Sequence, residues 1–91
     1  MCTNITMRTD IQGAAKGAGG WFTADTACVS FDHPFHAPFD HTLNIDFVNE
    51  RAGRPTRVAI ELSPSSARAL VKTIMDALAQ GEAEAGLSSA S

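Results

Sequence analysis

All the histidines of this 91-residue chain lie within one nine-residue segment, and two aspartates accompany them. They are His33, His36 and His41, with Asp32 and Asp40 beside them in the sequence. Imidazole nitrogens bind Zn²⁺ at about 2.0–2.1 Å, and three protein ligands with one open position is the pattern of a catalytic zinc site. The segment therefore predicts a three-histidine metal site.

The flanking residues explain how these side chains could converge. Residues 21–33 and 41–48 alternate between apolar and polar positions, which predicts two strands joined by a proline-containing loop. In such a hairpin His33 and His41 lie on one face, where opposed Cβ atoms are about 4.5–5.5 Å apart. His36, from the loop, would be the third ligand. Zinc is the first expectation, and iron and copper stay open because imidazole suits several metals.

The two aspartates have candidate roles in catalysis. Asp32, Asp40 or, from the strand at 56–62, Glu61 could orient a metal-binding imidazole through a hydrogen bond or act as a general base. The first hypothesis is therefore a small metal-binding protein that could also be a metal-dependent enzyme on a small organic substrate. The sequence leaves open whether the chain is an enzyme.

A second hypothesis gives the same residues a structural role. Histidine is common in turns, and no standard metal motif such as H-E-x-x-H is present in the sequence. On this interpretation the chain is a non-catalytic dimeric module. It binds a small molecule or a protein partner through the open face of its sheet, and a homodimer would form through that sheet. Alternation places Asn44, Asp46, Arg57 and Glu61 on this open, polar face.

The hydrophobic pattern predicts the fold class. Alternation at residues 2–8, 21–33, 41–48 and 56–62 indicates four antiparallel strands with one apolar face. The glycine-rich residues 12–20 are expected to form a loop. A helical stripe follows, with Ser63 as N-cap, Pro64 at the first position and Gly81 as C-cap. The prediction is an α+β domain over residues 1–81, with one sheet face covered by the helix, and a flexible tail at 82–91.

Composition excludes several partners. The chain has seven basic and ten acidic residues, a net charge of −3, so nucleic-acid binding is not expected. No apolar run reaches the ~18–20 residues of a membrane span, and the N-terminus does not resemble a signal peptide. A cytoplasmic protein is expected, in which Cys2 and Cys28 are thiols. Cys2 is either an edge-strand residue or, after removal of Met1, an N-terminal nucleophile or chelator.

Several stretches of the sequence together resemble a family of small actinobacterial proteins of unknown function. They are the opening Met-Cys-Thr, residues 16–22, Asp32-His33-Pro34, residues 41–47, the strand at 58–62 and the helix start at 66–70. The similarity extends over roughly residues 1–80. It implies a bacterial cytoplasmic protein and supplies no catalytic residues.

Overall fold

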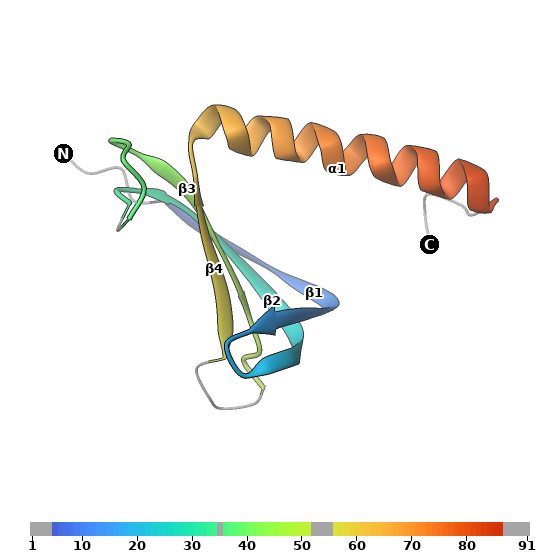
Figure 1. The fold of residues 1–91 in the computed structure, drawn as a ribbon, viewed down its shortest axis with the longest axis horizontal. Helices are drawn as coiled ribbons and strands as arrows, with labels where there is room; N and C mark the ends of the chain where they lie inside the picture. The colour runs from blue at the N-terminus through green and yellow to red at the C-terminus, as the bar shows by residue number, and fades with distance from the viewer. Residues whose placement is uncertain (1–4, 35, 52–55, 87–91) are drawn as a thin grey trace.

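The computed structural model describes residues 5–34, 36–51 and 56–86, which form four strands and one helix (Figure 1). The strands pair antiparallel in chain order, and the helix follows the last of them. This confirms the predicted α+β class. The elements are β1 (Ile5–Gly17), β2 (Gly20–Asp32), β3 (Thr42–Val48), β4 (Arg57–Leu62) and α1 (Pro64–Ala85).

The expected glycine-rich loop is instead the second half of β1. The register runs without a break from Gly13 opposite Ala24 to Gly17 opposite Gly20, so only two residues form the turn. The loop prediction was wrong because it weighed glycine's low strand propensity alone. Pairing with the β-forming residues 21–26 of β2 supplies a backbone ladder for β1, and such context overrides propensity.

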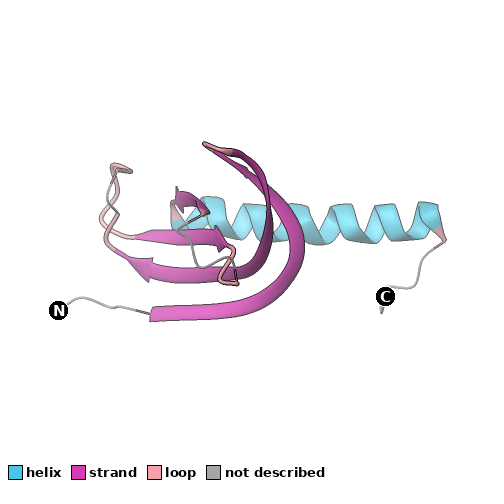
Figure 2. Cartoon of the chain, turned by 90° about the horizontal axis from the view of Figure 1, so that it is seen from below, coloured by secondary structure: helices cyan, strands magenta, loops and turns pink. Residues whose placement is uncertain are grey.

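A bulge bends this long hairpin. Ile11 and Gln12 of β1 stand opposite the single residue Asp25 of β2, and a bulge of this kind increases local bend and twist. The hairpin consequently curls over the sheet (Figure 2). Its tip reaches β4: a Cβ atom added at Gly17 would lie 3.5 Å from Phe22 Cε1 and 3.7 Å from the Arg57 carbonyl oxygen.

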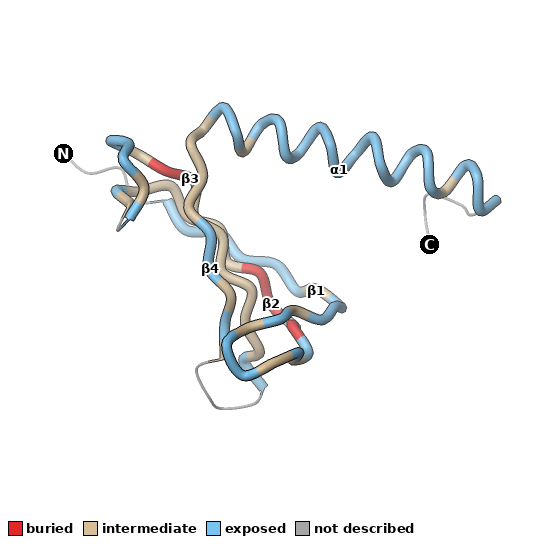
Figure 3. The backbone as a smooth tube through the Cα atoms, in the orientation of Figure 1, coloured by how far each residue is buried: buried red, intermediate tan, exposed pale blue. Residues whose placement is uncertain are grey.

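Alternation gives the sheet two chemically different faces. We call one the apolar face, formed by Ala27, Val29, Phe31, Leu43, Ile45, Phe47, Val58, Ile60 and Leu62. The other is the polar face, formed by Cys28, Ser30, Asn44, Asp46, Arg57, Ala59 and Glu61. Among the described residues only Ala24, Thr26, Ala27 and Thr42 are buried (Figure 3). One chain therefore closes a very small core.

The start of the helix was predicted correctly and its end was not. Ser63 is the N-cap, with its hydroxyl accepting a hydrogen bond from the Ser66 N–H at 3.2 Å, and Pro64 opens the first turn. The helix continues past Gly81 and is capped by Gly86, whose φ of 69° is left-handed. Gly81 keeps helical geometry because one glycine costs a helix only about 1 kcal/mol. Part of the expected tail is thus helical, and residues 87–91 lie outside the described residues.

The helix covers less of the sheet than expected. It contacts β3 and β4 near its beginning and then extends away from the sheet (Figure 1). None of its residues is buried. The link from β4 is the single residue Ser63, held extended at φ −61° and ψ 152°, as expected for a residue that precedes proline. Because this link is extended, the helix axis points away from the sheet. No helix in the described part of the chain is long and apolar enough to cross a membrane.

Candidate functional site

His33 and His41 come together as predicted, at the ends of the β2–β3 connection. Their ring centroids are 4.7 Å apart, and the His41 ring stacks on Phe31 at 5.5 Å with an interplanar angle of 6°. His33 Nδ1 lies 2.9 Å from the Asp40 carbonyl oxygen. A ring nitrogen in contact with a carbonyl must donate, so in the neutral ring Nε2 of His33 keeps its lone pair.

His36 lies with a different group of residues. Its backbone N–H donates to Glu61 Oε1 at 2.9 Å, and the N–H of Ala37 donates to the same oxygen at 2.9 Å. Glu61 belongs to the polar face. Phe31, on which the His41 ring stacks, belongs to the apolar face, so His36 and His41 are held on different sides of the sheet. Within residues 5–34, 36–51 and 56–86, no three His, Cys, Asp or Glu side chains are grouped so that they could hold a metal ion. The structure assembles a histidine pair, and the three-histidine site stays a prediction.

The two aspartates serve this loop through local hydrogen bonds. Asp32 Oδ1 accepts from the backbone N–H of His33 at 2.7 Å. Asp40 contributes its backbone carbonyl to His33, and its side chain is exposed. These contacts shape the ends of the loop. The catalytic role of either carboxylate stays a prediction. Cys2, the other candidate nucleophile, lies outside the described residues.

The polar face contains a hollow that we call the polar hollow. It is lined by Ser30, His36, Ala37, Asn44, Asp46, Arg57, Ala59, Ile60 and Glu61. Ser30, Asn44 and Glu61 are directly paired across β2, β3 and β4, so their side chains form one row. Asn44 Nδ2 donates to Ser30 Oγ at 3.4 Å, and the Thr42 hydroxyl donates to Asn44 Oδ1 at 2.6 Å.

Two of the charged residues in the polar hollow, Arg57 and Asp46, are only loosely paired with each other. Arg57 Nε lies 4.0 Å from Asp46 Oδ1, and the two side chains are 63% and 33% exposed. An exposed pair at this distance is worth well under about 1 kcal/mol. Either group can therefore exchange its partner for an opposite charge on a ligand at little cost.

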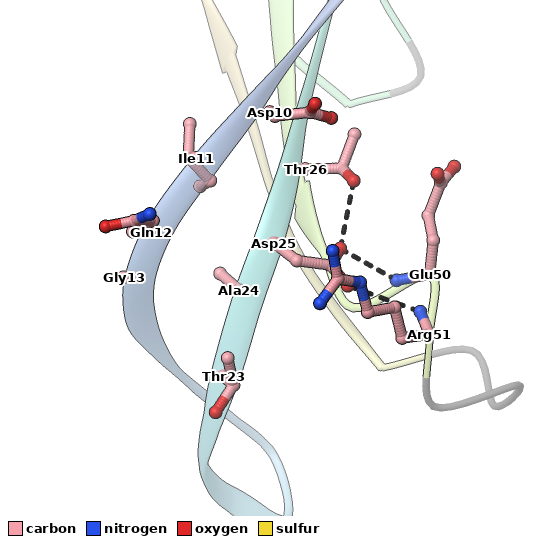
Figure 4. A pocket seen from close by; sticks show the side chains of 10 residues that line it. All are labelled: Asp10, Ile11, Gln12, Gly13, Thr23, Ala24, Asp25, Thr26, Glu50 and Arg51. Atoms are coloured by element: carbon pink, nitrogen blue, oxygen red, sulfur yellow. Dashed lines mark hydrogen bonds between the residues drawn. The ribbon is translucent and has the colours of Figure 1, made fainter.

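A second hollow lies at the bulge of β1, beside the β3–β4 connection (Figure 4). Asp25 points to that connection and accepts hydrogen bonds from the N–H groups of Glu50 at 3.0 Å and Arg51 at 3.3 Å. The Thr26 hydroxyl adds a third at 2.9 Å. The Glu50 N–H is the main reason that the pKa of Asp25 lies below its ordinary value of 3.8, against the opposing effect of desolvation. Asp25 therefore anchors this connection.

Comparison with protein families gives a match over residues 1–89, to a family of unknown function designated DUF6295. The chain belongs to that family. No curated protein and no solved structure matches it. The resemblance to a family of unknown function is thus confirmed, and its actinobacterial origin stays an expectation. Membership carries no site residues, so the candidate sites depend on geometry.

Sequence reasoning found part of these sites. The alternation placed Asn44, Asp46, Arg57 and Glu61 on one polar face, which the structure confirms. It missed the role of Glu61 in holding the loop, and it missed Asp25. The hydrogen bond from the Glu50 N–H to Asp25 joins residues 25 positions apart in the sequence. No local pattern predicts such a contact. The available signal was an acidic residue on a strand face that is otherwise apolar.

Proposed function

We propose that this protein is a non-catalytic binding module that holds a small zwitterionic molecule in the polar hollow of its sheet. One observation supports this above all: a hydroxyl, an amide, one guanidinium and two carboxylates from three adjacent strands line the same hollow, and one of the carboxylates, Glu61, already binds the loop. Polar groups that converge on a hollow are the usual means of fixing a ligand's orientation.

The proposed ligand class follows from the charges. The guanidinium of Arg57 suits a carboxylate, which it can bind through two parallel hydrogen bonds. The carboxylate of Asp46 suits an ammonium group. Asn44 and Ser30 supply both donors and acceptors between the strands. Free amino acids and short peptides carry this combination of groups at small size.

The test is a titration of the ¹⁵N-labelled chain with free amino acids and dipeptides, followed by amide chemical shifts. We expect shifts that concentrate at residues 30, 44–46 and 57–61 for some members of the panel. Arg57→Gln and Asp46→Asn should each weaken binding about tenfold, as expected for a lost charged hydrogen bond. Lys72→Gln on the helix is the matched control and should leave binding unchanged. A panel that shifts no amides of the polar hollow would refute the proposal.

The histidine pair supports a second candidate function, metal binding. The Nδ1–H of His33 donates a hydrogen bond to the backbone carbonyl oxygen of Asp40, and a hydrogen bond of this kind orients most metal-binding histidines. The ring of His41 lies 4.7 Å away, within the range at which two imidazoles can share an ion. Water or a further ligand would complete the coordination of zinc or copper.

Metal titration of three single variants tests this candidate. His33→Ala and His41→Ala should each lower the affinity for Zn²⁺ or Cu²⁺ at least tenfold, by calorimetry with metal content from mass spectrometry. His36→Ala is the matched control and should retain the metal. Loss of metal in all three variants would favour the three-histidine arrangement over the pair. Failure of the unmodified chain to bind metal would reject both.

A further inference from the structure

The helix presents an apolar seam that is partly covered at its start, at Ala67, and exposed from Val71 onward in the described part of the chain. Residues at alternating four- and three-residue spacing lie on one side of α1, as in the core positions of paired helices. They are Ala67, Val71, Ile74, Leu78 and Gly81. Val71 is 61% exposed, Ile74 50% and Leu78 52%, with the neighbouring Met75 at 63%. Because none of its residues is buried, α1 gains little stability from packing on its own sheet, although most helices depend on such packing.

The surface of the chain is larger than one folded subunit requires. A monomer of 9.6 kDa is expected to expose about 5,100 Å², whereas this chain exposes 7048 Å². Its radius of gyration of 15.1 Å also exceeds the ~12 Å expected for a compact domain of this length. A standard interface buries about 800 Å² on each partner. Less than half of the excess area would supply one.

We propose that the seam of α1 packs against the same seam of a second copy of this chain, as an antiparallel helix pair with a two-fold axis close to Ile74. A two-fold contact must be complementary to itself. An axis between Ile74 and Met75 places Val71 opposite Leu78 of the partner subunit. It brings Ala67 within one residue of direct opposition to Gly81 of the partner subunit, so the bulky residues meet near the axis and the small residues near the ends of the seam.

The charges beside the seam fit this arrangement. Arg68 lies on the same flank of α1 as Met75 and Glu82, at seven-residue spacing. In the antiparallel pair Arg68 lies within one residue of direct opposition to Glu82 of the partner subunit, which its long side chain can reach, and the symmetry repeats this contact. Within one helix the two residues are about 21 Å apart. They can therefore attract each other only across the interface.

The helix charge argues against a lipid surface as the occupant. Arg68 and Lys72 are outweighed by Asp76, Glu82 and Glu84. Interfacial helices are typically rich in Lys and Arg on their polar side, which binds anionic headgroups. A second copy needs no such charge. This interface is also separate from the polar hollow and stands independently of the ligand proposed for it.

Sedimentation velocity and light scattering test the interface in the micromolar range. We expect a dimer for the unmodified chain. Ile74→Glu should raise the dimer dissociation constant at least a hundredfold, since it buries a charge beside the axis. Ala69→Glu adds the same charge on the opposite side of the helix and should leave the dimer intact. A monomeric unmodified chain, or equal effects of the two variants, would overturn the proposal.

A charge exchange tests the antiparallel register without relying on a core substitution. Arg68→Glu and Glu82→Arg should each raise the dissociation constant about tenfold, because each replaces two attractions by two repulsions. The double variant Arg68→Glu/Glu82→Arg should restore it. Far-ultraviolet circular dichroism of each variant shows whether the helix is kept. If the two increases in the dissociation constant multiply in the double variant while the helix is retained, the antiparallel pairing is excluded. Binding to anionic vesicles by a monomeric chain would assign the seam to a lipid surface instead.

Discussion

The carboxylate of Glu61 holds the peptide of His36 over the polar face of the sheet, through a hydrogen bond of 2.9 Å from the His36 N–H to Oε1. The same oxygen accepts from Ala37. One residue of β4 thus places the middle of the β2–β3 connection on the polar side. This bond associates His36 with the polar hollow instead of with the pair formed by His33 and His41.

Removing this carboxylate should loosen the connection. Glu61→Ala leaves two backbone N–H groups without their acceptor, and we expect a loss of about 1–2 kcal/mol in the free energy of unfolding. Amide exchange at His36 and Ala37 should accelerate. Glu61→Gln keeps an acceptor oxygen and is the matched variant, with a smaller loss expected. Unchanged exchange at both amides in Glu61→Ala would show that the bond does not hold the loop.

Asp25 should make the stability of the chain depend on pH. Its pKa is lower in the folded chain than in the unfolded one because Glu50 donates a backbone N–H to it. Its stabilising contribution is therefore complete above the ordinary pKa of 3.8, which applies in the unfolded chain, and is lost as the pH falls through the lower pKa of the folded chain. We expect Asp25→Asn to be less stable than the unmodified chain at neutral pH, with the difference vanishing in acid. Urea unfolding at a series of pH values measures this.

The matched control for Asp25 is Asp40→Asn. It removes one carboxylate without touching the β3–β4 connection, and its difference from the unmodified chain should not follow the same course. If both variants show the same pH dependence, the effect belongs to net charge and not to the contact with Glu50.

The N-cap makes a separate contribution to helix stability. Ser63→Ala removes the acceptor of the Ser66 N–H, and such a loss costs about 1 kcal/mol. For a domain of this size, the melting temperature should fall by about 4–8 °C. Ser65→Ala, two residues later, lacks this role and should change the melting temperature little. Thermal unfolding followed by circular dichroism at 222 nm distinguishes the two.

The two glycines near the end of α1 should respond oppositely to alanine. Gly86 has a left-handed φ of 69°, so Gly86→Ala should destabilise the chain by about 1 kcal/mol. Gly81 lies inside the helix, and a Cβ atom added there would meet nothing within 4 Å. Gly81→Ala should therefore stabilise the chain by about 0.5–1 kcal/mol. Gly81 also faces the proposed partner, so the melts need several protein concentrations. Equal signs for both substitutions would contradict the observed helix end.

The strands β2, β3 and β4 and the start of α1 follow from local patterns in the sequence. Alternation defined the apolar and polar faces of β2, β3 and β4, and the Ser63–Pro64 pair marked the helix start, because side-chain period and capping chemistry are properties of neighbouring residues. The sequence also predicted that His33 and His41 would meet, since two strands joined by one short connection leave little choice of partner.

Other features of the fold depend on contacts between residues that are far apart in the sequence, and these appear only in the folded chain. Pairing with β2 converted the glycine-rich stretch into strand, because backbone hydrogen bonds from another segment outweigh weak local propensity. The bond to Glu61 placed His36 over the polar face. The direction of α1 is set at Ser63, so that only its beginning contacts the sheet and most of its apolar stripe extends beyond the sheet (Figure 1). A hydrophobic pattern indicates which face of an element is apolar enough to be buried. Whether the same chain can bury that face depends on the path of the chain in space.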